Sequence, residues 1–107
     1  MTFAALRSLG LAVAATIFLG TVSARAEEHN VTIDNFTFTP AQLSVKVGDT
    51  VTWTNHDDIP HTVVSAGKYR SKAMDTDGTF SFTFTSAGDY KYFCSLHPHM
   101  TGMIKVE

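Results

Sequence analysis

Apolar and polar residues alternate along most of the chain after residue 26, with the two-residue period of β-strands. Turn-forming residues separate the alternating segments, and no helical pattern interrupts them after residue 26. This organisation predicts an all-β fold, a small antiparallel Greek-key β-sandwich. The clearest alternating segments are 31–34, 43–47, 50–54, 80–85 and 103–106, with turns at 48–49, 57–60, 75–78 and 87–89.

The alternation loses its phase between Ile33 and Phe36. A single displaced residue in a strand is typical of a β-bulge or a bend. We therefore expect a bulge or bend near Asn35.

The first 26 residues follow a different pattern. Arg7 precedes an uncharged apolar run over residues 9–22, and Ala24-Arg25-Ala26 places small residues at the positions that a signal peptidase reads. The apolar run is shorter than the roughly 20 residues that a membrane-spanning helix needs. We therefore predict a Sec-type signal peptide, residues 1–26, cleaved before Glu27. The prediction also implies a periplasmic location and one domain, residues 27–107.

The charge balance narrows the function classes. The chain has eight Lys and Arg and ten Asp and Glu, and two of its cations, Arg7 and Arg25, lie in the predicted signal peptide. An acidic domain of this kind is not expected to bind nucleic acid. The sequence shows no Ser-His-Asp arrangement and no second metal cluster besides the candidate site around the single cysteine described below. We therefore do not expect an enzyme.

The chain contains a single cysteine, Cys94, which lies in the stretch YFCSLHPHMTGM over residues 92–103. It has no partner for an intramolecular disulfide, and an exported thiol is a liability unless it is buried or bound to a metal. Two histidines and two methionines follow it within nine residues. These neighbouring potential ligands favour a metal site over a buried cysteine that has no functional role.

His97 follows Cys94 in the same loop, and Pro98 restricts its backbone to extended conformations. His61, at the start of an apolar run, is the natural third ligand because it enters from a different strand. Two imidazoles and one thiolate, with a thioether at longer distance, form the donor set that favours copper electron transfer. His99 remains a rival to His97 at this level of analysis.

Met100 and Met103 are the two candidates for the thioether ligand. If Ile104 and Val106 face the core, the alternation turns Met103 and Lys105 outward. The pattern therefore favours Met100 over Met103.

Three segments in this order resemble the cupredoxins, and among them most closely the amicyanin group: VKVGDTVTWTN over 45–55, Pro60-His61, and CSLHPHM over 94–100. The last segment is the most specific, because two residues separate cysteine from histidine and two separate histidine from methionine. The resemblance covers nearly all of residues 27–107.

The resemblance implies a type 1 blue copper site with one copper ion that cycles between Cu(I) and Cu(II). It implies His61, Cys94 and His97 as equatorial ligands and Met100 as the axial ligand. It further implies a monomer that carries single electrons between transient redox partners, such as a dehydrogenase or a c-type cytochrome. His99 stands where amicyanins have phenylalanine, which makes the expected docking surface more polar.

A periplasmic copper carrier or buffer that delivers copper to a partner is the alternative function, because it would use the same soft ligands. Thr62 follows His61 where amicyanins have asparagine, and its hydroxyl could connect the two ligand loops. His29 and His56 are expected to be solvent-exposed. A second copper site near the N-terminus at His29 is expected to need more than one histidine, so none is predicted there.

Overall fold

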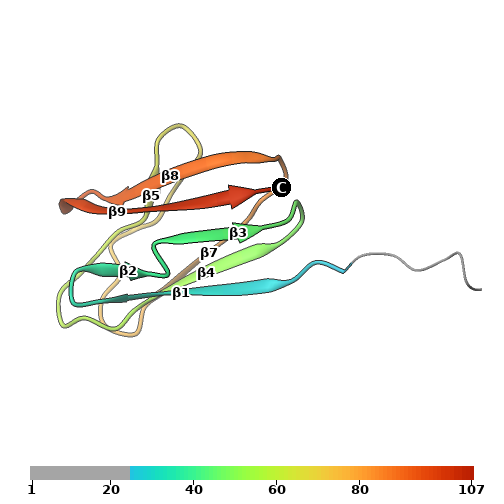
Figure 1. The fold of residues 1–107 in the computed structure, drawn as a ribbon. Helices are drawn as coiled ribbons and strands as arrows, with labels where there is room; N and C mark the ends of the chain where they lie inside the picture. The colour runs from blue at the N-terminus through green and yellow to red at the C-terminus, as the bar shows by residue number, and fades with distance from the viewer. Residues whose placement is uncertain (1–24) are drawn as a thin grey trace, which may run out of the picture.

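The computed structural model describes residues 25–107, which form a two-layer β-sandwich (Figure 1). The predicted signal peptide lies almost wholly outside these described residues. Within them, no helix has the length and apolarity to cross a membrane.

The described chain contains nine strands in two sheets. One sheet has four strands in the order β2-β1-β4-β7, and the other has five in the order β3-β9-β8-β5-β6. The strands are β1 (Glu28–Asp34), β2 (Thr37–Thr39), β3 (Gln42–Val45), β4 (Thr50–Asn55), β5 (Val64–Ser65), β6 (Tyr69–Arg70), β7 (Thr79–Thr83), β8 (Gly88–Cys94) and β9 (His97–Val106).

The all-β sandwich is confirmed, but two of its strand pairings are not antiparallel. β1 pairs with β4 in parallel, and β3 pairs with β9 in parallel. The remaining pairings are antiparallel, including the long β8–β9 hairpin that carries the cysteine-containing stretch. The sandwich is therefore antiparallel in most of its pairings, as predicted, and these two parallel pairs are the exceptions.

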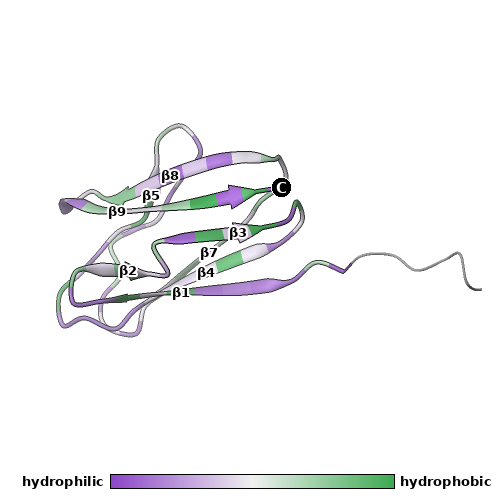
Figure 2. Cartoon of the chain, in the orientation of Figure 1, coloured by the Kyte–Doolittle hydropathy of each residue, from purple (hydrophilic) through white to green (hydrophobic). Residues whose placement is uncertain are grey.

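The core lies between the sheets and is rich in aromatic rings. Trp53 on β4 is fully buried and contacts Tyr92 on β8, with ring centroids 5.4 Å apart, so this pair joins the two layers. The alternation that predicted the strands reappears in the burial of β4, in which every second side chain is buried. Hydropathy follows the same division, with apolar segments in β3, β4 and β9 and a hydrophilic start of β1 (Figure 2).

The phase slip near Asn35 corresponds to the turn between β1 and β2. Asn35 and Phe36 both have positive φ, 52° and 56°. This conformation is uncommon for residues with a side chain. The backbone therefore bends here, as predicted, and the bend exposes half of the Phe36 side chain.

Candidate metal centre

Three of the predicted ligands come together at one end of the sandwich. His61 lies in the connection between β4 and β5, Cys94 ends β8 and His97 begins β9. One ligand atom from each of the three lies within 4.8 Å of the others. Sγ of Cys94 is 3.8 Å from Nδ1 of His61 and 3.6 Å from Nδ1 of His97. Two imidazole nitrogens and one sulfur therefore face a common point.

The three side chains differ in their access to solvent. His61 and Cys94 are fully buried, whereas His97 is only partly buried. The β8–β9 hairpin turns at residues 95–96 and brings His97 back beside Cys94. A register irregularity between Phe93 and Cys94 accompanies the turn.

The surroundings of Cys94 favour its thiolate. Burial raises the pKa of the Cys94 thiol, but the hydrogen bond from the Thr62 amide and those with His61 and His97 outweigh it. Together they bring the pKa down from 9.0 to about 6. The thiolate is the form that binds metals.

Thr62 connects the two ligand loops, as its position predicted. Its backbone amide lies 3.3 Å from Sγ of Cys94, and its Oγ1 accepts a hydrogen bond of 2.7 Å from the amide of Ser95. Oγ1 also lies 2.8 Å from Oγ of Ser95. These contacts hold the loop after His61 against the loop after Cys94, so the spacing of the ligands does not depend on either loop alone.

Asn55 and Met74 fix the backbone on either side of His61. The Asn55 side-chain amide donates to the carbonyls of Ile59 and Met74, at 2.9 and 2.8 Å. Met74 and His61 form an isolated antiparallel bridge, with backbone hydrogen bonds of 3.2 and 2.8 Å. Met74 is thus a packing residue of the core and supports a ligand loop through its backbone.

Asp57 contacts the opposite nitrogen of the His61 ring. Its Oδ2 lies 2.7 Å from Nε2 of His61. The same carboxylate accepts hydrogen bonds from the amides of Asn35 and Phe36, at 2.6 and 2.9 Å. The Phe36 amide, followed by the Asn35 amide and His61, holds the pKa of Asp57 down to about 2 against the effect of burial. Asp57 is therefore a carboxylate that orients the imidazole, a contact that the sequence patterns did not indicate.

Phe36 covers the two histidines. Its ring makes edge-to-face contacts with His61 and His97, with centroids 5.5 and 5.1 Å apart. The positive φ at Asn35 and Phe36 places it there, and Asp57 holds the turn in place. The sequence marked this turn only by the phase slip.

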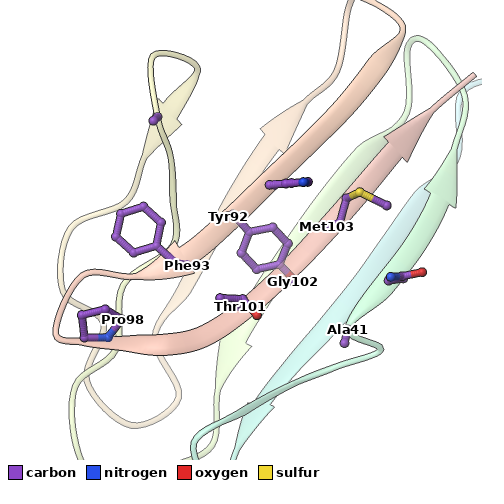
Figure 3. Close-up of a pocket in the computed structure, with 10 residues that line it drawn as sticks. Ala41, Tyr92, Phe93, Pro98, Thr101, Gly102 and Met103 are labelled. Carbon is purple, nitrogen blue, oxygen red and sulfur yellow. The ribbon is translucent and has the colours of Figure 1, made fainter.

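The rival residues occupy different environments. Met100 is buried in the same apolar cluster as Cys94, whereas Met103 lines a groove together with Tyr92, Gly102 and Pro98 (Figure 3). His99 is exposed. His97, and not His99, therefore lies beside Cys94, and Met100, and not Met103, is buried in the cluster that contains Cys94.

The two remaining histidines were both expected to be exposed. His56 is exposed, but the expectation is wrong for His29. The His29 side chain is only 20% exposed, and its Nε2 lies 2.9 Å from Oδ2 of the buried Asp49.

The donor chemistry of the cluster fits copper. Cysteine thiolate and methionine thioether are soft ligands that select copper, and a trigonal set of two histidines and one cysteine is typical of blue-copper sites. Asp57, the partner of Nε2 on His61, also fits a metal site. Metal-bound histidines generally donate a hydrogen bond from their second ring nitrogen to a carboxylate or carbonyl. His61, Cys94 and His97 could hold the ion, with Met100 beside them.

Comparison with known proteins agrees with this chemistry. The chain is 39% identical to the amicyanin of Paracoccus denitrificans, over 72% of this chain and 63% of the relative. It is 30% identical to amicyanin-alpha of Methylorubrum extorquens, over 95% and 100% of the two chains. The chain therefore spans less than two thirds of the Paracoccus relative.

Solved structures show the same fold. A Cu(I) structure of an amicyanin mutant matches with a TM-score of 0.71 and 35% identity, over 81% of this chain and 87% of that chain. A purple cupredoxin from Nitrosopumilus maritimus matches with a TM-score of 0.71 and 32% identity, over 74% and 99%. A family model described as a cupredoxin-like domain matches residues 7–106. This chain belongs to the cupredoxin-like family, and its relatives include the amicyanins.

Proposed function

We propose that this protein carries single electrons through one copper ion held by His61, Cys94 and His97, with Met100 as a weak axial ligand. The observation that carries the proposal is the convergence of Nδ1 of both histidines on Sγ of Cys94, at 3.8 and 3.6 Å. A copper ion bound there would supply one-electron chemistry by alternating between Cu(I) and Cu(II).

The protein's own groups restrict how far the ligands can move. Thr62 fixes the distance between the two loops, and Asp57 fixes the His61 ring. A site whose ligands are held in this way changes little between oxidation states, which favours rapid electron exchange over release of the ion. The same rigidity argues against the alternative of a copper carrier or buffer, which must open to hand over its cargo.

His97 is the proposed route for electrons to the surface because it is the most exposed of the three ligands. Leu96 and Phe36, each 50% exposed, lie on the turns that flank it, and Pro98 is also exposed. Met100, the proposed axial ligand, is buried and does not contribute to this surface. A small apolar patch suits brief docking of a redox partner, such as a dehydrogenase or a c-type cytochrome.

The proposal includes export to the periplasm and removal of residues 1–26, so that the working protein is a monomer of residues 27–107. The signal-peptide pattern of the sequence supports this step.

The absorption spectrum of the copper-loaded, oxidised protein tests the function. We expect an intense visible thiolate-to-copper band that disappears on reduction, returns on oxidation and is absent in Cys94→Ser. A colourless Cu(II) complex would refute the assignment. Tight binding of Cu(I) with no stable Cu(II) form would favour the copper buffer.

A further inference from the structure

The opposite end of the sandwich holds a second group of potential metal ligands. Side-chain ligand atoms of Glu27, His29 and Asp49 lie within 4.8 Å of one another. β1 begins at this end, whereas the β8–β9 turn with Cys94 and His97 lies at the other (Figure 1). The two groups are therefore separate sites.

The Asp49 carboxylate contacts both ends of the peptide from Glu27 to His29. Its Oδ1 accepts a hydrogen bond from the backbone nitrogen of Glu27, and its Oδ2 lies close to Nε2 of His29, both at 2.9 Å. The Lys46 amide donates to the same carboxylate, also at 2.9 Å. Asp49 is only 3% exposed, so this carboxylate is fixed in the fold. The backbone nitrogen of residue 27 and the imidazole of residue 29 are thus already held near one another.

Cleavage before Glu27 would change the chemistry of this peptide. The nitrogen of Glu27 becomes a primary amine, and His29 becomes the third residue of the chain. Four nitrogens then follow in order: the amine, the amides of Glu28 and His29, and Nδ1 of His29. Consecutive donors of this kind close fused five- and six-membered chelate rings around one ion, in a square plane. Cu²⁺ and Ni²⁺ are the ions that prefer square-planar or tetragonal nitrogen donors.

We propose that the mature protein binds a second metal ion, Cu²⁺ or Ni²⁺, through the amine of Glu27, the amides of Glu28 and His29, and Nδ1 of His29. The proposal rests on the cleavage position given under the proposed function. Binding displaces the protons of the two amides and any proton on the amine, and no electron is transferred.

The existing contacts support the role of His29. Its hydrogen bond to Asp49 uses Nε2, which leaves Nδ1, the nitrogen nearer its own backbone, available for the ion. A carboxylate on the outer nitrogen is the usual second partner of a metal-bound histidine. A side-chain oxygen of Glu27 lies within 4.8 Å of the ligand atoms of His29 and Asp49 and would be available as a further donor.

The rest of the fold tolerates the change. Pairing of β1 with β4 starts at Glu28 with Thr50 and His29 with Val51, and four further pairs follow up to Ile33 with Asn55. Binding would release only the first pairs of this ladder. The centre around Cys94 is not disturbed, so the mature chain would hold two ions of different character.

The test uses protein exported through its own leader and already loaded with one equivalent of copper. Its intact mass identifies the first residue, and titration with Ni²⁺ and then Cu²⁺ follows the second site. We expect a first residue Glu27, one further equivalent of either ion and a tetragonal Cu²⁺ resonance distinct from the first site. His29→Ala should abolish this second equivalent, and the matched control His56→Ala should retain it.

A protein with one additional methionine before Glu27 keeps the Glu27, His29 and Asp49 side chains but moves the histidine to the fourth position. It should lose the second equivalent as well. Asp49→Asn should weaken binding by about tenfold, the loss typical of an outer partner of a metal ligand. The proposal is wrong if the first residue differs, if the second equivalent stays free, or if the methionine-extended protein binds it equally well. A different first residue would identify the cleavage position, and not the chelate, as the error.

Discussion

Oδ2 of Asp57 lies 2.7 Å from Nε2 of His61, on the side of the ring that faces away from Cys94. The carboxylate therefore accepts a hydrogen bond from Nε2–H, which leaves the lone pair of Nδ1 directed at the sulfur side of the ring. It also makes the imidazole a stronger donor, which stabilises Cu(II) more than Cu(I). Asp57→Ala should weaken Cu(II) binding by about 10- to 100-fold and raise the midpoint potential.

The neighbouring Asp58 is exposed, so Asp58→Ala is the matched control and should change neither quantity. Asp57→Asn keeps an acceptor for the backbone amides of the Phe36 turn but loses the charge. If Asp57→Asn restores the potential of the native protein, the carboxylate acts only by holding the turn.

The two histidines of the ligand loop should behave differently. Nδ1 of His97 lies 3.6 Å from Sγ of Cys94, whereas the side chain of His99 is exposed. His97→Ala should open the centre, so that added imidazole restores the visible band, while His99→Ala should leave the spectrum nearly unchanged. Titrating both variants with imidazole checks this. The reverse pattern would transfer the ligand role to His99.

The methionines provide a similar pair. Met100 is 6% exposed and packs in the cluster that contains Cys94, whereas Met103 is only partly buried and lines the groove. Loss of a weak axial thioether destabilises Cu(II) more than Cu(I). Met100→Leu should therefore keep the visible band and raise the midpoint potential, and Met103→Leu should not shift it. Voltammetry of the two variants decides between them, and equal potentials would exclude Met100 as the axial ligand.

The sequence predicts the strands and three members of the centre for local reasons. One face of each major strand is buried, so alternation marks β3 and β4 directly, and the short turn that joins Cys94 to His97 lies within consecutive residues. Alternation does not distinguish parallel from antiparallel neighbours, because both have the same period. The β1–β4 and β3–β9 pairings were therefore missed.

The residues around the centre are harder to predict because their contacts are distant in sequence. Asp57 accepts a hydrogen bond from the Asn35 amide, 22 positions away in the sequence. Phe36 contacts His61 and His97 only because the turn that Asp57 holds places its ring beside them. Neither residue belongs to a motif. Thr62 was identified because it adjoins a predicted ligand.

Tyr92 packs directly over Gly102, the residue opposite it in the β8–β9 hairpin (Figure 3). A Cβ at position 102 would overlap the phenol ring, and that ring is buried against Trp53 and Phe38. Gly102→Ala should therefore lower the free energy of unfolding by about 1–3 kcal/mol, the usual cost of overpacking. Urea denaturation measures it, with the exposed Thr101→Ala as control. Equal stabilities would mean that the ring moves aside at no cost.

Tyr69 offers a prediction that is independent of the metal. Within the described residues, its hydroxyl is buried with no hydrogen-bond partner, while its ring packs against Trp53 and Phe82. Tyr69→Phe keeps the ring and removes the unpaired hydroxyl. The free energy of unfolding of the apoprotein at neutral pH should therefore rise by about 1 kcal/mol.

The effect of Tyr69→Phe should grow in alkali. Burial raises the pKa of the Tyr69 hydroxyl above its ordinary value of 10.0. In the unfolded chain the group loses its proton near pH 10, whereas the folded protein still holds it, so the unfolded state binds fewer protons and stability falls as the pH rises. The stability that is linked to the raised pKa of Tyr69 is therefore fully present below pH 10 and is lost as the pH rises above it. Tyr69→Phe lacks this titration, so its advantage over the native protein should widen above pH 10.

Urea denaturation of both apoproteins from pH 7 to pH 11 measures the difference. Tyr90→Phe is the control, because the Tyr90 hydroxyl already donates a hydrogen bond of 2.8 Å to the Ser86 carbonyl. Its removal should lower stability at neutral pH, since the hydrogen bond to the Ser86 carbonyl is lost. A constant difference between Tyr69→Phe and the native protein across this range would show that the Tyr69 hydroxyl reaches water in the folded state.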